Sequence, residues 1–200
     1  MEPTVNPIKV KYKFAADYGL ILGGYIAFFY CLQLIFGTNI VVNLLNTVGL
    51  IGTPFLCYQL AKRYRDNGCN GFINFANAWS FGVWLFLFAG LIMAVVYFVH
   101  LQWIDPSYMA NTFNQTLEAL EKMHYDQKLI DTLSSTPIPT PIQIVVMYLF
   151  FYIIGGALLF LMLAGFVVKK DPTAGLPGNG SGETPYQPYK DTTSSTDKNA

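Results

Sequence analysis

Four long apolar runs dominate the pattern of hydrophobic and polar positions along the chain. They cover residues 18–36, 40–61, 78–101 and 142–168, and none of them contains Asp, Glu, Lys or Arg. A helix of roughly 20 residues crosses a hydrocarbon layer about 30 Å thick. Because a core helix of a soluble protein rarely keeps so long an uncharged run, the pattern predicts an all-α, polytopic membrane protein with four transmembrane helices.

Only Gly37, Thr38 and Asn39 separate the first run from the second, which predicts a tight helical hairpin. Lysines precede the first run, as they do in a secretory signal peptide. The run is longer than the roughly 7–15 residues of a signal core, however, and no Ala-x-Ala cleavage site follows it. We therefore expect the first run to stay in the protein as a membrane anchor.

The segment between the third and fourth runs is polar and has the pattern of a helix. Asp105-Pro106-Ser107 is a helix-start signal, because Asp or Ser accepts a free backbone N–H and Pro suits the first turn. A stripe of residues then recurs three or four positions apart, at Met109, Phe113, Leu117, Leu120 and Met123 or His124. Such a stripe indicates an amphipathic helix, and a shorter helix is expected after Asp126. We predict an external helical cap over about 105–135, whose stripe rests on the membrane surface or on the span ends; partner binding is the alternative.

The composition changes abruptly after Lys170. Residues 171–200 are rich in Pro, Gly, Ser and Thr and contain few large aliphatic side chains. Such a segment buries too little apolar area to offset the entropy of ordering it. The expected organisation is an N-terminal cytoplasmic segment at 1–13, a four-helix transmembrane domain at 14–170 and a disordered cytoplasmic tail at 171–200.

The distribution of charge predicts the orientation. Hydrophobic residues make up 53% of the chain and charged residues 12%, with no net charge, so no basic field attracts nucleic acid and the expected partner is the lipid bilayer. The basic residues near the first, second and fourth runs fall on one face: Lys9, Lys11, Lys13, Lys62, Arg63, Arg65, Lys169 and Lys170. Lys and Arg are retained on the cytoplasmic side. We expect both termini in the cytoplasm and the cap outside it.

Residue types that carry catalysis or bind metals are scarce. Cys31 and Cys57 lie inside apolar runs and Cys69 follows one, so no external disulfide is expected, unlike in tetraspanin-like and claudin-like folds. His100 and His124 lack metal-ligand spacing and are interpreted as interfacial residues of an aromatic belt. Motifs of hydrolases, metalloproteases and phosphate-binding loops are absent from the sequence. We expect no enzymatic activity and no cofactor.

Polar side chains within or beside the apolar runs are the candidate intramembrane contacts, because each one is costly in lipid. The candidates are Asp17, Asn43, Asn46 and Asn77. Asp17 suits the N-terminal end of a helix dipole, with a proton relay as the alternative. Asn43 and Asn46 share one helix face near Pro54, which removes a backbone hydrogen bond and favours a kink. This arrangement predicts helix packing, with a small permeation path as the alternative.

Small residues four positions apart are candidate helix-packing surfaces, because they let two helix backbones approach closely in lipid. The pairs are Gly19 with Gly23 and Ala78 with Gly82.

Three stretches carry a family resemblance. They are "AADYGLILG" at 15–23, "NGFINFANAWSFG" at 70–82 and "WIDPSYM" at 103–109, the last followed by a polar helical segment and a final span ending in Lys-Lys. Together they resemble the bacterial membrane-protein family catalogued as domain of unknown function 4199, typical of Bacteroidetes, over about residues 12–171. The resemblance implies a four-helix protein of the inner membrane with one external helical loop. It implies no activity and no site residue.

Two functions are compatible with the sequence. The first is a non-enzymatic scaffold or interaction component that assembles with itself or with another membrane protein of the envelope. The alternative is a small oligomeric transporter or channel, since four spans enclose little space by themselves. In that case Asp17, Asn43 and Asn46 would line the path.

Overall fold

The computed structural model describes residues 7–37 and 39–170, and these form helices with short connections. In chain order the elements are α1 (Pro7–Phe36), α2 (Ile40–Gly68), α3 (Phe75–Val99), a π-helical turn (His100–Ile104), α4 (Tyr108–Lys122), α5 (Gln127–Ser134) and α6 (Pro141–Val167). Four helices, α1, α2, α3 with its π turn, and α6, are long and apolar enough to cross a membrane. The predicted all-α, four-span fold is confirmed.

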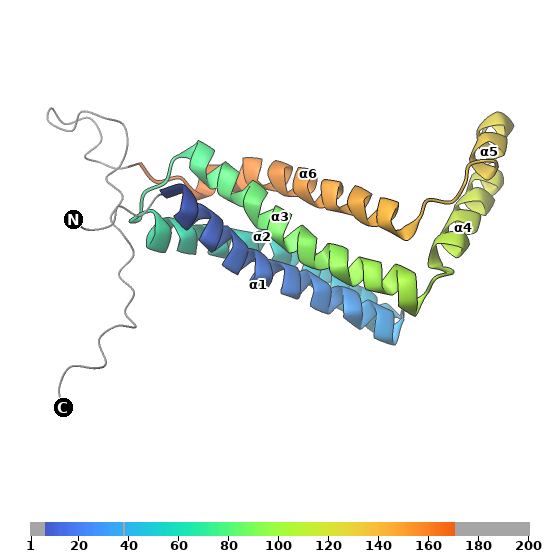
Figure 1. Ribbon diagram of the computed structural model, residues 1–200, viewed down its shortest axis with the longest axis horizontal. Helices are drawn as coiled ribbons and strands as arrows, with labels where there is room; N and C mark the ends of the chain where they lie inside the picture. The colour runs from blue at the N-terminus through green and yellow to red at the C-terminus, as the bar shows by residue number, and fades with distance from the viewer. Residues whose placement is uncertain (1–6, 38, 171–200) are drawn as a thin grey trace, which may run out of the picture.

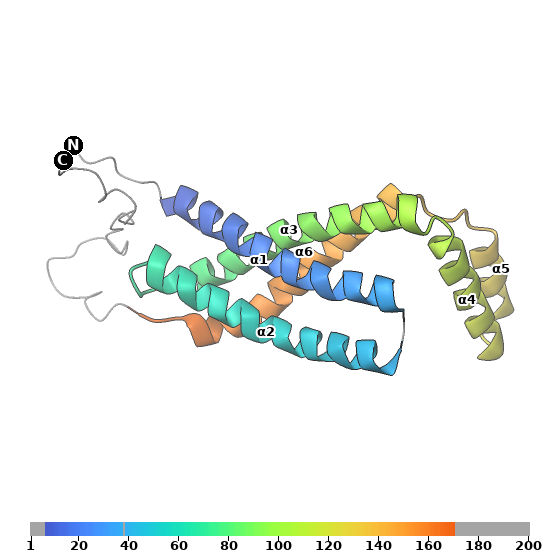
Figure 2. The same cartoon turned by 90° about the horizontal axis from the view of Figure 1, so that it is seen from below.

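The four long helices form one elongated bundle (Figures 1 and 2). The start of α1 and the end of α6 lie at one end of the bundle, which we call the basic end. The short helices α4 and α5 lie at the opposite end, which we call the hairpin end. Helix α3 is central, since it packs along both α1 and α6, while α2 packs mainly against α1.

Close approach of α3 to its neighbours depends on small residues. A Cβ atom on Gly82 would overlap the ring of Phe160, and one on Gly156 would overlap the ring of Phe86. Helices α3 and α6 therefore interlock reciprocally, each placing a phenylalanine over a glycine of the other. Along α1, Gly19 lies against the backbone of α3, where an added Cβ would be 3.2 Å from the carbonyl oxygen of Leu85.

The main core fills the half of the bundle near the basic end. Phe81, Leu85 and Phe160 are fully buried there, and the rings of Tyr64 and Phe81 stack with centroids 4.2 Å apart. In α2, by contrast, the first half buries only Val42 and Gly49. Figure 2 shows why: towards the hairpin end α2 diverges from α6, so this part of α2 keeps α1 as its neighbour.

Local sequence explains where the helices begin. The side chain of Asn39 accepts a hydrogen bond from the backbone N–H of Val42 at 2.9 Å, and Asn74 accepts one from Asn77 at 2.8 Å. Helix α2 continues through Pro54. One turn earlier, the hydroxyls of Tyr25 and Thr53 both donate to the Gly49 backbone carbonyl. Helix α1 begins before the predicted span. Its first turns carry the lysines that precede the apolar run, so the helix is longer than the uncharged segment.

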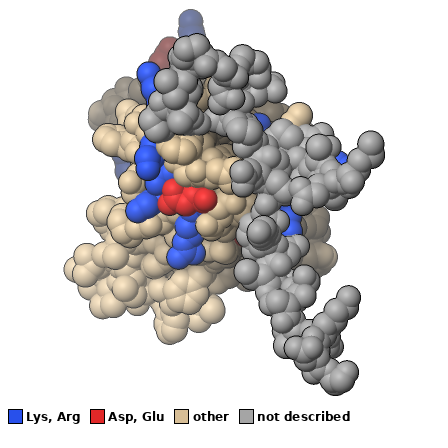
Figure 3. All heavy atoms as spheres, turned by 90° about the vertical axis from the view of Figure 1, so that its left-hand side faces the viewer, with Lys and Arg blue, Asp and Glu red and all other residues tan. Residues whose placement is uncertain are grey.

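The basic end is fastened by hydrogen bonds between distant segments. Ile73 and Lys169 exchange backbone hydrogen bonds of 3.0 and 3.2 Å, and the guanidinium of Arg65 donates to the Val167 carbonyl at 3.2 Å. Lys11 donates to the hydroxyl of Ser80 at 3.0 Å, which joins α1 to α3. Figure 3 views this end, where Lys and Arg side chains gather along one side.

The segment between α3 and α6 forms a helical hairpin that lies across the bundle axis and reaches past α6 (Figure 1). Helix α4 packs chiefly on α5, where Ile130 is buried. Of the predicted stripe, Met109 packs against the bundle, beside Leu101 and Ile144. Met109 is thus the stripe residue seen against the span ends, and for the other residues the expectation that the stripe rests on the membrane surface or on the span ends stays a prediction. Phe113, Leu117 and Leu120 are partly buried, whereas Met123 is 73% exposed.

Candidate functional site

Uncharged polar side chains form a patch on the lipid-facing side of α1 and α2 near the hairpin end. We call Gln33, Asn43, Asn46 and Thr47 the amide patch. The amide of Asn46 donates to the Gln33 side chain at 3.4 Å, and the Thr47 hydroxyl donates to the Asn43 carbonyl at 2.9 Å. Asn43 is exposed, and its side-chain amide has no partner among the described residues. The patch thus presents hydrogen-bonding groups on the outer surface of an apolar helical hairpin.

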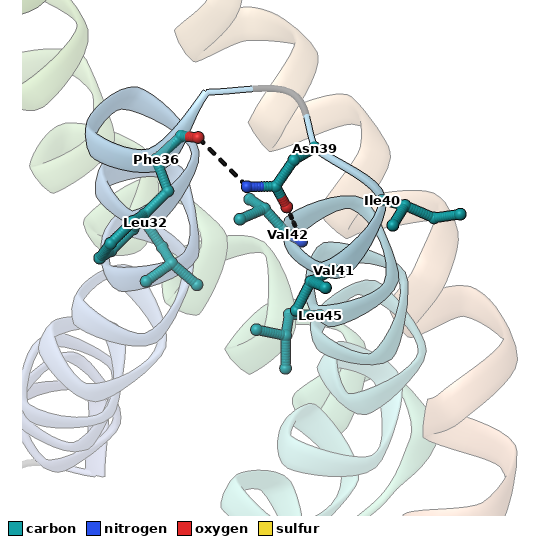
Figure 4. Close-up of a pocket in the computed structure, with 7 residues that line it drawn as sticks. All are labelled: Leu32, Phe36, Asn39, Ile40, Val41, Val42 and Leu45. Atoms are coloured by element: carbon teal, nitrogen blue, oxygen red, sulfur yellow. Dashed lines mark hydrogen bonds between the residues drawn. The ribbon is translucent and has the colours of Figure 1, made fainter.

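A shallow cavity of about 390 Å³ lies beside this patch, where α1 and α2 meet (Figure 4). Its lining is apolar except for one residue: Leu32, Phe36, Asn39, Ile40, Val41, Val42 and Leu45. Asn39 donates to the Phe36 carbonyl at 3.4 Å and accepts from Val42, so backbone groups occupy its amide. The cavity therefore offers hydrocarbon surface and suits an apolar side chain or an acyl chain.

The other polar candidates lie far from the amide patch. Asp17 is exposed near the start of α1, with no side-chain partner in the described chain. Sixteen residues of helix, roughly 24 Å, separate it from Gln33. Asn77 is exposed in the first turn of α3, where its backbone N–H bonds to Asn74. Asn43 and Asn46 thus share the hairpin-end part of α2, whereas Asp17 and Asn77 lie towards the basic end of the bundle.

The small-residue candidates lie at helix contacts. Gly19 and Gly23 face α3, where an added Cβ on Gly23 would be 3.1 Å from the Cα atom of Ala89. Ala78 is buried in the main core, and Gly82 lies under the ring of Phe160.

His100 differs from its interpretation as an interfacial residue. Its exposed fraction is only 3%, at the first position of the π turn that ends α3. The hydroxyl of Tyr30, on α1, hydrogen-bonds to its Nδ1 atom. The rings of Tyr30 and Tyr108 flank the imidazole, with centroids 5.7 and 5.1 Å away. His124, by contrast, is exposed just after the end of α4, and its interfacial role stays a prediction.

Three tyrosines form a stack next to His100. Tyr97 of α3 lies between Tyr30 of α1 and Tyr148 of α6, with ring centroids 4.6 and 4.5 Å away. Sequence reasoning missed this cluster, because Tyr97 is 67 residues from Tyr30 and 51 residues from Tyr148, and all three look like ordinary belt tyrosines. The sequence did contain one sign of this cluster, which was a histidine at the end of a predicted span, close to a tyrosine.

A family model described as "Protein of unknown function (DUF4199)" matches residues 17–169. The chain belongs to the DUF4199 family. This family has no assigned function. Membership therefore assigns no function to the amide patch, or to His100 and the tyrosines around it, in this DUF4199 protein. Searches of the curated proteins and of the solved structures each found no match.

The described part of the DUF4199 chain contains no group of three or more His, Cys, Asp or Glu side chains that could hold a metal ion. The described residues offer two arrangements of hydrogen-bonding groups. One is the amide patch, and the other is the buried His100 with the tyrosines around it. Both arrangements lie in the half of the bundle near the hairpin end, where the main core is absent.

Proposed function

We propose that this multi-pass membrane protein is a non-enzymatic assembly component whose α1–α2 hairpin binds a second copy of the chain within the bilayer. The amide patch is the contact. A carboxamide is both donor and acceptor, so the patch is complementary to itself across a two-fold axis. The single observation that carries the proposal is the exposed amide of Asn43, which has no partner in the described chain.

Exposure of α2 supports the same contact. Along its first half, large apolar side chains face outward, with Ile40 86% and Leu44 66% exposed. These residues flank the amide patch and the apolar cavity. A second copy placed here would pair the amides and cover the apolar surface around them, which excludes lipid from the hydrogen bonds.

The charge distribution supports an orientation. The basic end would lie in the cytoplasm, with both termini, and the α4–α5 hairpin outside it, in the inner membrane of a bacterium. The absence of net charge argues against a nucleic-acid partner. Phe81 and Phe160 fill the interior of the single bundle, so the alternative function, a small transporter or channel, would need an oligomer to enclose its path.

The experiment replaces the two asparagines, as Asn43→Leu with Asn46→Leu, in the full chain. Energy transfer between labelled copies in lipid nanodiscs or mild detergent measures the dimer dissociation constant. Interhelical hydrogen bonds average about 0.6 kcal/mol each, so two to four of them supply about 1.2–2.4 kcal/mol. We expect the dissociation constant to rise about 8- to 60-fold.

Asn77→Leu is the matched control, because it removes an exposed amide at the other end of the bundle. It should leave the dissociation constant unchanged. Equal effects of the two variants, or a parent chain that stays monomeric at high protein-to-lipid ratio, would show that the amide patch does not join copies. Capture of another envelope protein by a monomeric parent would point to the heterologous partner instead.

A further inference from the structure

The ends of α2 and α6 meet at the basic end of the bundle. The guanidinium of Arg65 donates to the Val167 carbonyl at 3.2 Å, and Lys169 pairs with Ile73 through two backbone hydrogen bonds. Lys62 lies three residues before Arg65, so both are on the same side of α2. All the lysines at this junction are exposed. We call Lys62, Lys169 and Lys170 the lysine cluster.

The lysine cluster lies at the depth of lipid headgroups. Lys62 directly follows the apolar run that ends at Ala61, and Lys169 directly follows the run that ends at Val168. The hydrocarbon core of a bilayer is about 30 Å thick, and headgroups add about 5–8 Å on each side. A lysine just past the hydrocarbon core extends its ammonium group into this layer, where the lipid phosphates lie.

Within the described part of the chain, no carboxylate forms an ion pair with the lysine cluster. The nearby carboxylate of Asp66 is bound instead by the Nε atom of Arg65 at 2.8 Å. The Nζ atom of Lys169 lies 5.5 Å from the centre of the Phe72 ring, a contact that leaves its charge in place. Arg65 also covers the Val167 carbonyl, one of the groups at a helix end that would repel a phosphate. The cluster therefore presents positive charge that is available to an anion.

Apolar surface continues from the lysine cluster along both helices. On α6, Met162 and Phe166 are four residues apart on one side of the helix, and they are 73% and 75% exposed. On α2, Phe55 lies two turns before Lys62 on the same side and is 66% exposed. A free phosphate ion makes no use of such a surface, whereas the acyl chains of a phospholipid pack along it while the headgroup contacts the lysines.

We propose that the lysine cluster binds the headgroup of an anionic phospholipid, whose acyl chains lie along α2 and α6. The ammonium groups donate hydrogen bonds to the phosphate, and the exposed apolar side chains pack against the chains. Each Lys or Arg near a membrane surface increases the affinity for anionic lipid about fivefold. The site lies at the opposite end of the bundle from the amide patch, so it does not depend on contact between copies.

Arg63 distinguishes a binding site from a general attraction by the basic end. It is the neighbour of Lys62 on α2, is also exposed and carries the same charge. Successive residues are about 100° apart around a helix, so Arg63 lies on the opposite side of α2 from Arg65 and the end of α6. A general attraction would depend equally on Lys62 and Arg63, whereas a site at the junction of α2 and α6 depends on Lys62.

The test uses the full chain in phosphatidylcholine nanodiscs, so that Asp171 and the rest of the tail, which lie outside the described residues, are present. Phosphatidylglycerol or phosphatidylcholine with the same fluorescent acyl chain is titrated in. Saturable energy transfer from the tryptophans to this chain measures the affinity for each lipid, and the ratio of the two affinities is the selectivity. We expect the parent chain to prefer phosphatidylglycerol by about tenfold or more.

The neighbouring cations on α2 supply the matched variants. Lys62→Gln should lower the selectivity about fivefold, and Lys62→Arg should preserve it, because the charge at this position is retained. Arg63→Gln should change the selectivity by less than about twofold. On the other helix, Lys169→Gln with Lys170→Gln should lower it about fivefold or more, which keeps the test decisive if Lys62→Gln does not insert.

Inorganic phosphate in excess separates the two sources of a phosphate group. It should leave the labelled phosphatidylglycerol bound, whereas unlabelled phosphatidylglycerol should displace it. Equal affinities of the parent for the two lipids, equal losses in Lys62→Gln and Arg63→Gln, or displacement by inorganic phosphate would each overturn the lipid site.

Discussion

The reciprocal contact between α3 and α6 makes Gly156 a sensitive position for stability. A Cβ atom there would overlap the ring of Phe86, whereas the neighbouring Gly155 has no other atom within 4 Å of such a Cβ. Gly156→Ala and Gly155→Ala are therefore the same chemical change on consecutive residues of one helix. Any gain in helix propensity, about 0.5–1 kcal/mol in an exposed helix, is common to both.

The difference between the two variants isolates the packing cost. Adding a methyl group to a filled interior costs about 1–3 kcal/mol, because side chains and backbone must shift. Phe86 is nearly buried, and its ring also packs against Phe160 at 6.2 Å, so it has little room to move. We expect Gly156→Ala to be less stable than Gly155→Ala by about 1–3 kcal/mol.

The measurement is the free energy of unfolding from reversible titration with sodium dodecyl sulfate, followed by circular dichroism in mixed micelles. Adding Phe86→Leu to Gly156→Ala should recover part of the loss, since the shorter side chain vacates the space the methyl group needs. Equal unfolding midpoints for the two alanine variants would refute the interlocked packing of α3 and α6.

Two further predictions test the orientation and the chemistry of the basic end. A reporter active only outside the cytoplasm should give signal when fused at residue 120 and none at residue 180, because the basic residues flank the spans on one side; signal at 180 would reverse the topology. Burial raises the pKa of the Cys69 thiol above its ordinary value, partly offset by Tyr64 and Lys11. Since the thiolate is the reactive form, the pH at half-maximal alkylation rate should be higher for Cys69 than for a cysteine placed at exposed Asn67 in a Cys69→Ser chain, and equal pH profiles would contradict this.

Several features of the fold could be predicted from local sequence because local physics decides them. The length of each uncharged run determines whether a helix can cross a hydrocarbon layer, and all four predicted spans are helices long and apolar enough to do so. Asp126 marks the start of α5, as predicted, because its side-chain oxygen accepts a free backbone N–H within the same turn. Asn39 and Asn74 cap α2 and α3 in the same way, although their capping role was not among the predictions.

The tertiary structure alone decided which side of each span is buried. In a soluble helix an apolar stripe marks the packed side, but these spans are apolar all round, because lipid and protein interior favour the same side chains. Nothing in the local pattern therefore separated His100, buried against Tyr30, from an interfacial histidine. The amide patch shows the converse, since Asn43 and Asn46 could be assigned to one helix face from their spacing, but only the packing of α2 against α1 left that face open to the bilayer.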